Sequence, residues 1–360
     1  MKYNLADVCV RLSSGKGIPA KMIESSGRFP VYGGNGLRGY TEQSNFDGEC
    51  AIIGRQGAFC GNVRFFSGKA YMTEHAIVAV ANKDHNTRYL AYLLSTMSLG
   101  HLSAQSAQPG LSVKTLSKVT VDLPSKEEQD KAVNILSSLE DKIAENSKIN
   151  DNLAVLLQTV YQERFGDVDK AVEQGVLSDI CSYSKDRVAV SELDVSTYFS
   201  TENMLPRKAG STEATSLPTT PQTTACHKGD TLISNIRPYF KKIVYCEDEC
   251  GCSTDVLCFM PNQPQYSAYL FSTLYADKFF AFMVAGAKGT KMPRGDKQRI
   301  MTYPIVLPSE VALAEFNIIA LPLIKQIYSN RAENKRLSLL RDTLLPKLIS
   351  GELDVSDIDL

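Results

Sequence analysis

Residues 143–156 carry the sequence IAENSKINDNLAVL, and residues 327–340 carry IYSNRAENKRLSLL. A shift of 184 residues places five positions of the first stretch on identical residues of the second. At the same offset, Leu123-Pro124-Ser125 recurs as Leu307-Pro308-Ser309. Self-similarity at a fixed spacing indicates an internal repeat, which sets the architecture of a chain.

After each Leu-Pro-Ser, apolar residues recur at alternating spacings of three and four, which is the heptad period of a coiled coil. The pattern predicts long helices at residues 125–165 and 309–350. Asn residues occupy seam positions in both copies, where they weaken the packing but fix the register by hydrogen bonding to each other. We expect an antiparallel coiled coil whose register residues are Ile143, Asn146, Asn150, Leu153, Ile327, Asn330, Asn334 and Leu337.

Two prolines fall inside the second predicted helix. Because proline lacks a backbone donor and clashes with the preceding turn, Pro322 predicts a kink and Pro346 predicts the helix end.

The segments before the two helices, residues 1–124 and 166–308, contain short β-rich runs between Gly, Asn and Asp turns. Such runs are Ala51–Ile53, Asn62–Phe66, Ala76–Val80 and Lys242–Tyr245, and short helices are expected at residues 87–98 and 266–282. The sequence therefore predicts an α+β chain in which two mixed α/β domains alternate with two long helices. Residues 351–360 form a C-terminal tail.

Composition favours ordinary folding in the cytoplasm. Of the 360 residues, 43% are apolar, and the sequence has no run of 18 apolar residues and no signal-peptide pattern at its start. The nine cysteines are odd in number and irregularly spaced, which favours reduced thiols.

A net charge of -1 is an objection to nucleic-acid binding, which needs Lys and Arg. The charges are unevenly distributed, however. Residues 1–124 carry 13 basic and 8 acidic side chains, whereas residues 125–170 carry 6 and 10. Basic residues also gather between Lys288 and Arg299.

No catalytic pattern emerges. The stretch from Gly34 to Gly39 has the letters of a dinucleotide fingerprint, but a polar, turn-rich segment follows it instead of a helix. Cys246, Cys250, Cys252 and Cys258 have spacings that fit no standard zinc site, so free strand-borne thiols are expected. The four histidines show no metal or nucleophile pattern. The sequence predicts no catalytic residue, no metal and no cofactor.

Several stretches together resemble the specificity subunits of type I restriction-modification systems, over nearly the whole chain. These stretches are FPVYGGNG at residues 29–36, Gly39-Tyr40, IIGRQG at residues 52–57 and GDTLISNIRPY at residues 229–239. Each half then has an apolar stretch that ends in Leu-Pro before its long helix. Glu128-Gln129 follows the first Leu-Pro-Ser, but Ala312 and Leu313 stand in the second copy.

The resemblance implies that each globular part is a target recognition domain for one half of a split DNA sequence. It also implies that the helices are a spacer and a docking surface for two methyltransferase subunits. The expected partners are therefore double-stranded DNA and methyltransferase subunits, and the resemblance leaves open a restriction motor-nuclease subunit. The chain itself would be non-catalytic.

Polar side chains on Gly-rich loops can contact phosphates or base edges, and base-edge contacts specify sequence. The DNA-binding candidates are Asn35, Arg38, Tyr40, Arg55, Gln56, Asn62 and Arg64 in the first domain, and Asn235, Arg237, Tyr239, Lys241, Lys288, Lys291 and Arg294 in the second.

Two other functions remain open. One is a coiled-coil adaptor whose globular parts bind protein without DNA specificity. The other is a single-chain enzyme, although no segment is left unassigned to hold a catalytic domain. Charge reversal at Arg55 and Arg237 separates the adaptor from the DNA-recognition hypothesis, because DNA binding would be lost only in the latter.

Overall fold

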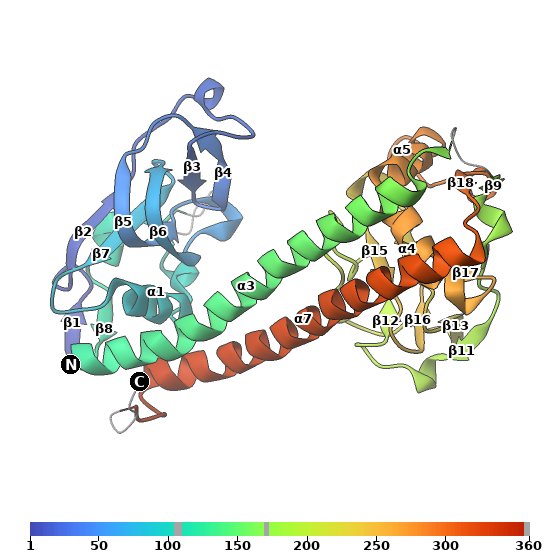
Figure 1. Cartoon of the computed structure of the whole chain (residues 1–360). Coiled ribbons are helices and arrows are strands. Elements are labelled where there is room, and N and C mark those ends of the chain that lie inside the picture. The colour runs from blue at the N-terminus through green and yellow to red at the C-terminus, as the bar shows by residue number, and fades with distance from the viewer. Residues whose placement is uncertain (104–109, 169–172, 356–360) are drawn as a thin grey trace. The chain divides into compact units, whose positions relative to one another are not determined.

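Two long helices, α3 (Lys126–Phe165) and α7 (Glu310–Ser350), each contribute to both structural units of the chain (Figure 1). Each helix begins one residue after its predicted start. The computed structural model describes residues 1–103, 110–168 and 173–355. Residues 356–360 of the predicted tail lie outside the described residues.

Unit 1 comprises Met1–Ala144 with Asn334–Leu360, and unit 2 comprises Glu145–Glu333. Because both division points fall inside the long helices, each unit contains one half of α3 and one half of α7. The helices are therefore parts of the two units.

The repeated Leu-Pro-Ser motif marks the start of each long helix. Ser125 Oγ accepts from Glu128 N (3.3 Å) and Glu128 Oε2 accepts from Ser125 N (2.8 Å), which is a capping box. Ser309 Oγ accepts from Ala312 N (3.3 Å), but Ala312 has no carboxylate with which to complete the box. The replacement of Glu128 by Ala312 in the second copy therefore changes how the start of the helix is capped.

Gln129 has a structural role that distinguishes the first copy further. Its side chain is fully buried, accepts from Asn86 N (2.9 Å) and donates to Pro124 O (2.9 Å). In the second copy, Leu313 is buried in an apolar core at the equivalent position. A polar connection in unit 1 is thus replaced by apolar packing in unit 2.

The prediction that Pro346 ends the second helix is wrong, because α7 continues to Ser350. Pro346 is exposed, so water can solvate the carbonyl that lacks its donor. Leu348 and Ile349, beyond the proline, are buried in the core of unit 1, and their burial offsets the lost hydrogen bond. Helix α7 also continues through Pro322, which is exposed as well.

Unit 1 is built around a six-stranded sheet of order β2-β7-β5-β6-β3-β4. Helix α1 (Thr87–Thr96) packs against β5, β6 and β7. Along β5, Ala51 and Ile53 enter one apolar cluster while Cys50 and Ile52 enter another. Both faces of this strand are therefore buried, which explains its continuous apolar run.

The other elements of unit 1 complete the sheet and its edges. Helix α2 is Val113–Leu116, and β1 pairs with β8. The strands are β1 (Lys2–Asn4), β2 (Cys9–Ser14), β3 (Phe29–Gly33), β4 (Gly36–Thr41), β5 (Phe46–Gly54), β6 (Val63–Met72), β7 (Ala76–Ala81) and β8 (Thr120–Asp122).

Unit 2 contains two four-stranded sheets, of order β10-β17-β14-β15 and β11-β13-β16-β12, and a β18-β9 pair. Its strands are β9 (Gln174–Val176), β10 (Cys181–Tyr183), β11 (Arg187–Ala189), β12 (Tyr198–Phe199), β13 (Gln222–Cys226), β14 (Thr231–Ser234), β15 (Ile243–Tyr245), β16 (Cys250–Cys252), β17 (Val256–Pro261) and β18 (Pro304–Val306). Cysteines from both sheets share one buried apolar cluster as free thiols.

The single helix predicted at residues 266–282 is wrong in detail. It is two helices, α4 (Ser267–Tyr275) and α5 (Asp277–Ala285), separated by the extended backbone of Ala276. Because the two helices can turn independently, Tyr269 and Phe279 both reach the same buried core. A short helix α6 follows at Lys297–Ile300.

Within each unit, α3 and α7 pack in antiparallel directions. In unit 1, Leu136 and Leu348 share a core, and Asn334 Nδ2 donates to Ile143 O (3.2 Å). In unit 2, Tyr161 packs on Phe316, with ring centroids 6.4 Å apart. Residues early in α3 thus meet residues late in α7.

The seam asparagines make three kinds of hydrogen bond. Asn330 Nδ2 donates to Asn150 Oδ1 (2.9 Å) in a buried pair, as the sequence pattern predicts. Asn146 Nδ2 donates to Glu333 Oε2 (2.8 Å), and Asn334 bonds a backbone carbonyl. The polar positions therefore use a carboxylate and the main chain as well as each other.

The apolar content of α7 passes a length and composition test for crossing a membrane, with a mean hydropathy of 1.4 over an 18-residue window. This is weak evidence, because core helices pass the same test. In this structure 28% of the window is buried, and Phe316, Ala320 and Ile324 of α7 lie in the core of unit 2.

His227 links separate segments of unit 2. Its Nδ1 lies 2.5 Å from Glu249 Oε2, and its Nε2 lies 3.2 Å from Asp186 Oδ2. The hydrogen bond to Glu249 is the largest effect on the imidazole and raises the pKa of His227 above its ordinary value, although partial burial opposes it.

We expect Asn330→Leu to destabilise the chain by about 1–3 kcal/mol, because it leaves the buried Asn150 amide without its partner. The double variant Asn150→Leu with Asn330→Leu should recover most of that loss, because both polar groups are removed together. Urea unfolding of the full chain measures the free energy of unfolding of the single and the double variant. The matched control is Asn152→Leu, at an exposed position of α3. A single variant no less stable than this control would contradict the role of the pair.

We expect the charged His227 to stabilise unit 2 fully below about pH 6.5, its pKa in the unfolded chain. Because folding raises the pKa, this stabilisation is lost as the pH rises through the folded-state value. The unfolding midpoints of the wild type and His227→Gln should therefore differ at about pH 5.5 and converge at about pH 9. His101→Gln, at an exposed position, is the control. An equal difference at both pH values would refute the linkage.

Candidate nucleic-acid interface

The first group of candidate residues surrounds the hairpin of β3 and β4. The hairpin pairs Gly33 with Gly36, so Gly34 and Asn35 form its two-residue turn. The expected Gly-rich loop is therefore a strand pair, and Arg38 and Tyr40 lie on β4. Glycine at position 36 permits the turn, since its φ is +96°.

Glycines bring this turn against the end of β5. A Cβ atom on Gly54 would lie 2.7 Å from Gly34 O, and one on Gly34 would lie 3.5 Å from Arg55 N. A Cβ atom on Gly36 would lie 2.8 Å from Arg64 Nη1. The structure therefore gathers the turn, Arg55 and Arg64 in one place.

Exposure separates the members of this group. Asn35, Arg38, Gln56, Asn62 and Arg64 are exposed. These five side chains are accessible to a ligand.

Arg55 and Tyr40 are more constrained. Arg55 is partly buried, and its Nη1 donates to Glu74 O (3.3 Å) and lies 3.5 Å from Ser14 Oγ. Tyr40 is partly buried, and its backbone pairs with Glu24. Arg55 therefore also holds the local structure together, so its charge reversal would perturb the fold as well as binding.

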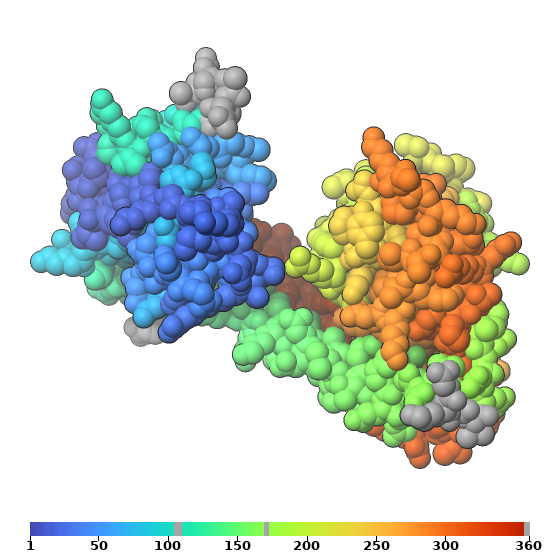
Figure 2. Space-filling model, turned by 90° about the horizontal axis from the view of Figure 1, so that it is seen from above, coloured from blue at the N-terminus to red at the C-terminus, as the bar shows by residue number. Residues whose placement is uncertain are grey.

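The second group lies where β14 ends in unit 2. Arg237 N donates to Pro293 O (2.8 Å), and Lys288 and Arg294 exchange two backbone hydrogen bonds of 2.9 Å. The segment after β14 thus lies against a small hairpin at residues 288–294. Figure 2 shows the yellow and orange surfaces of these parts of the chain adjoining each other.

Carboxylates hold several cations of this group. Arg294 Nη2 lies 2.9 Å from Asp255 Oδ1, and Lys288 Nζ lies 2.6 Å from Asp296 Oδ2. Lys241 Nζ lies 2.9 Å from Asp277 Oδ1. Lys291 is exposed near the tip of the hairpin.

Sequence reasoning missed a neighbouring basic pair, Arg207 and Lys208. Arg207 N donates to Phe240 O (2.7 Å) and Lys208 N donates to Lys241 O (2.9 Å). Lys208 Nζ lies 2.7 Å from Asp277 Oδ1. The hydrogen bonds from Lys208 and Lys241 lower the pKa of Asp277, which remains the shared anion of both lysines. No linear motif connects these distant residues.

Two buried polar atoms lie in the same region. Within the described part of the chain, Asn235 Oδ1 and Arg237 Nε have no hydrogen-bond partner. Asn235 is 7% exposed and Arg237 is partly buried. Unsatisfied buried polar groups cost free energy and call for an explanation, which a bound ligand could provide.

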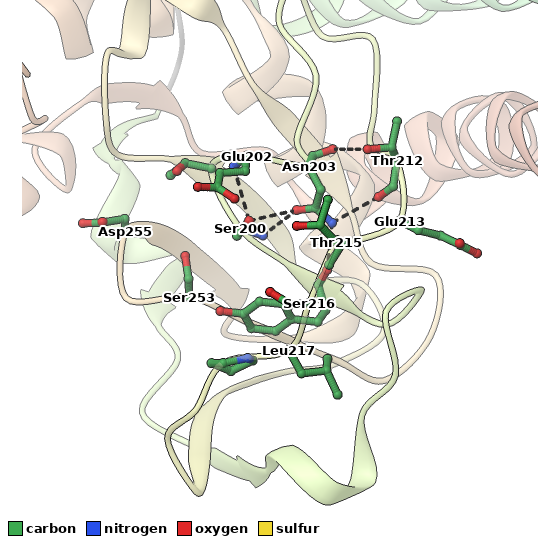
Figure 3. A pocket seen from close by; sticks show the side chains of 14 residues that line it. Ser200, Glu202, Asn203, Thr212, Glu213, Thr215, Ser216, Leu217, Ser253 and Asp255 are labelled. Atoms are coloured by element: carbon green, nitrogen blue, oxygen red, sulfur yellow. Dashed lines mark hydrogen bonds between the residues drawn. The ribbon is translucent and has the colours of Figure 1, made fainter.

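A polar pocket of about 340 Å³ borders this group in unit 2 (Figure 3). Asn203 joins two of its walls, because its Nδ2 donates to Tyr198 O (2.9 Å) and Thr212 O (3.1 Å). Glu202, Glu213 and Asp255 are the charged residues of its lining. The pocket therefore favours donors such as amino groups and repels phosphate.

No group of three or more His, Cys, Asp or Glu side chains is arranged to hold a metal ion within residues 1–103, 110–168 and 173–355.

Comparison with known proteins shows which family the first part of the chain resembles. Residues 1–154 match the family described as the type I restriction modification DNA specificity domain. This match covers 154 of the 360 residues, so the family description applies to the first part of the chain. The resemblance predicted from the sequence is thereby confirmed, and residues 1–154 are called the specificity domain below.

Two of the similar proteins are named as specificity subunits of type I restriction enzymes. The chain is 38% identical over 152 residues to the type I restriction enzyme EcoprrI specificity subunit of Escherichia coli, with 40% of this chain and 38% of that protein covered. It is 24% identical to the MjaIX specificity subunit of Methanocaldococcus jannaschii, with 76% and 70% covered. The chain thus spans about two fifths of the EcoprrI subunit.

The crystal structure of a type I restriction-modification system S subunit from M. genitalium matches the fold with a TM-score of 0.66 at 16% identity, with 97% of this chain and 95% of that one covered. The mixed α/β fold predicted from the sequence therefore agrees with a known S subunit, beyond the specificity domain as well as within it.

We expect Gly54→Ala to destabilise unit 1 by about 3 kcal/mol, because its Cβ atom would meet backbone atoms that cannot move independently. That Cβ atom would lie 2.3 Å from Phe59 O. Denaturant unfolding measures the loss. Gly17→Ala is the matched control, since the nearest atom to its Cβ is 3.8 Å away on the Glu74 side chain. Equal stability of the two variants would show that the close approach at Gly54 is unimportant.

Proposed function

We propose that this chain is the DNA-recognition subunit of a type I restriction-modification complex and has no catalytic activity of its own. Unit 1 would recognise one half of a split DNA target and unit 2 the other. The observation that carries the proposal is that each unit has its own cluster of basic and amide side chains beside a strand end. The family match of residues 1–154 supports the same function for unit 1.

The chemistry of the clusters suits direct recognition of bases. Arginine can donate two hydrogen bonds to guanine in the major groove, and Asn or Gln can pair with adenine. Unit 1 exposes such groups at Arg38, Arg64 and Asn35. In unit 2, Lys291 and Arg294 are exposed on the hairpin. Lysines at such positions can also contact phosphates, which position the protein without specifying sequence.

The long helices would join the two recognition domains as an antiparallel coiled-coil spacer and bind methyltransferase subunits. Residues 1–124 and 166–308 would form the recognition domains, and residues 125–165 and 309–350 the spacer. Buried polar pairs such as Asn150 and Asn330 support a fixed register between the helices. A fixed register is useful because the geometry between two recognition elements sets the spacing of their half-sites.

Exposed apolar side chains on the helices support a docking role. Val311 and Ile318 on α7 are 69% and 74% exposed and one heptad apart, so they lie on the same helix face. Val155 on α3 and Leu339 on α7 are also exposed. Such faces fit apolar surfaces of a partner. We propose two methyltransferase subunits as these partners, in the cytoplasm, with a restriction motor-nuclease subunit as a further component where the system cleaves DNA.

The first experiment is to co-express the chain with its methyltransferase partner and select duplexes from a random DNA library. We expect two short motifs separated by a constant gap, because two domains held by one spacer contact DNA at a set distance. Assembly with the partner but no enriched motif would refute DNA recognition and favour a protein-binding adaptor.

Charge reversal should remove one half of the motif at a time. We expect Arg38→Glu with Arg64→Glu to erase the half bound by unit 1 and to weaken binding by at least about tenfold, because each lost base contact costs about 1–3 kcal/mol. The other half-motif should persist. The control is Lys118→Glu, an exposed residue of unit 1 outside the cluster. Retention of both half-motifs in the double variant would contradict the assignment of this cluster.

A further inference from the structure

An exposed aromatic pair stands in the middle of the basic cluster of unit 2. Tyr239 is 50% exposed and Phe240 is 40% exposed. Their ring centroids lie 4.8 Å apart, with an angle of 57° between the ring planes. Single exposed apolar residues are common on protein surfaces, whereas two packed rings form a defined apolar surface.

The backbone holds the two rings away from the core. The rings belong to a 3₁₀ turn, Pro238–Phe240, whose flanking residues Arg237 and Lys241 have φ values of 49° and 52°. This left-handed conformation is unfavourable for residues other than glycine, and it persists only where the surrounding structure enforces it. Strain of this kind clusters at functional sites.

The surrounding contacts enforce this turn. Pro238 is buried beneath it, and Phe240 O and Lys241 O accept from the backbone of Arg207 and Lys208. Arg207 and Lys208 also have positive φ values, of 57° and 63°. The turn at residues 237–241 and the Arg207–Lys208 segment are therefore hydrogen-bonded to each other, and these bonds fix the backbone that carries the aromatic pair.

Positive charge surrounds the rings on several sides. Arg207 is exposed, and Lys242 Nζ lies 6.0 Å from the centre of the Phe240 ring. Asp277 neutralises Lys208 and Lys241 in part. The neighbouring hairpin adds Lys291 and the 50% exposed Met292.

An apolar centre with a cationic rim is complementary to DNA, which offers stacked bases inside two lines of phosphates. The unpartnered Asn235 Oδ1 lies at the base of the same segment.

We propose that Tyr239 and Phe240 form an aromatic wedge that stacks against one base step of double-stranded DNA and partly unstacks it. This inference rests on the proposed function and adds an apolar contact to it. The rings contribute sequence preference through the ease with which a base step unstacks, and the cations around them hold the phosphates. Pyrimidine-purine steps are the most readily unstacked, so the wedge favours such a step in the half-site of unit 2.

The test compares the wild type with Tyr239→Ala plus Phe240→Ala, as the full chain assembled with its methyltransferase, on the duplex selected from the random library. We expect about 10- to 100-fold weaker binding, as is typical when base-stacking aromatic side chains are removed. The slope of log affinity against log salt concentration should not change, because no phosphate contact is lost. In the wild-type complex, unstacking should raise the fluorescence of a 2-aminopurine base placed at the contacted step. The double variant should lose this increase.

Conservative variants and a charge variant serve as controls. Tyr239→Phe keeps both rings and should keep the affinity and the fluorescence signal, whereas Lys291→Gln should flatten the salt dependence if it contacts phosphate. Val195→Ala, at an exposed apolar position elsewhere in unit 2, should bind as the wild type does.

Three results would overturn the wedge. The first is a double alanine variant that stays folded and binds within twofold of the wild type. The second is 2-aminopurine fluorescence in the wild-type complex that does not rise at any position of the half-site. The third is a wild-type complex that enriches no motif, which refutes the proposed function together with the wedge. If the first result comes with weakened methyltransferase assembly, the rings are a protein contact.

Discussion

Each unit completes its hydrophobic core with one half of α3 and one half of α7. Leu136 and Leu348 are buried in the core of unit 1, and Tyr161 and Phe316 in the core of unit 2. Neither globular part can therefore be separated from the helices without exposing apolar side chains to water, at a cost of about 1.5–3 kcal/mol for each fully buried residue. The shared helices make the stability of each unit depend on parts of α3 and α7 that are distant from each other in the sequence.

The internal repeat explains why the architecture could be predicted from the sequence. A heptad pattern and a helix-capping Ser are local signals, so Ser125 and Ser309 mark the helix starts within one residue. The predicted helix range ends at residue 350, as α7 does, but the effect of Pro346 could not be found in the same way. Whether Pro346 stops the helix depends on the burial of Leu348 and Ile349, and that burial involves residues distant in sequence.

The candidate interface was predictable to different extents in the two units. In unit 1, the glycines of the β3–β4 hairpin are visible in the sequence, and they bring the flanking polar residues together. In unit 2, Arg207 and Lys208 join the cluster through backbone hydrogen bonds to Phe240 and Lys241. Such pairing follows no sequence period. Charge and motif alone therefore found Arg237 and Lys241 but missed the segment that braces them.

Both candidate clusters contain residues with positive φ values, but the residue types differ between the two units. Unit 1 brings backbone segments together with glycine, which adopts positive φ values and close contacts at little steric cost. Unit 2 places Arg237 and Lys241 in the left-handed region, and both side chains are partly buried there. A glycine there would relieve strain but would remove a cation beside the exposed rings. The retention of strained basic residues, where glycine would be more stable locally, favours a role for those side chains in binding an anionic partner.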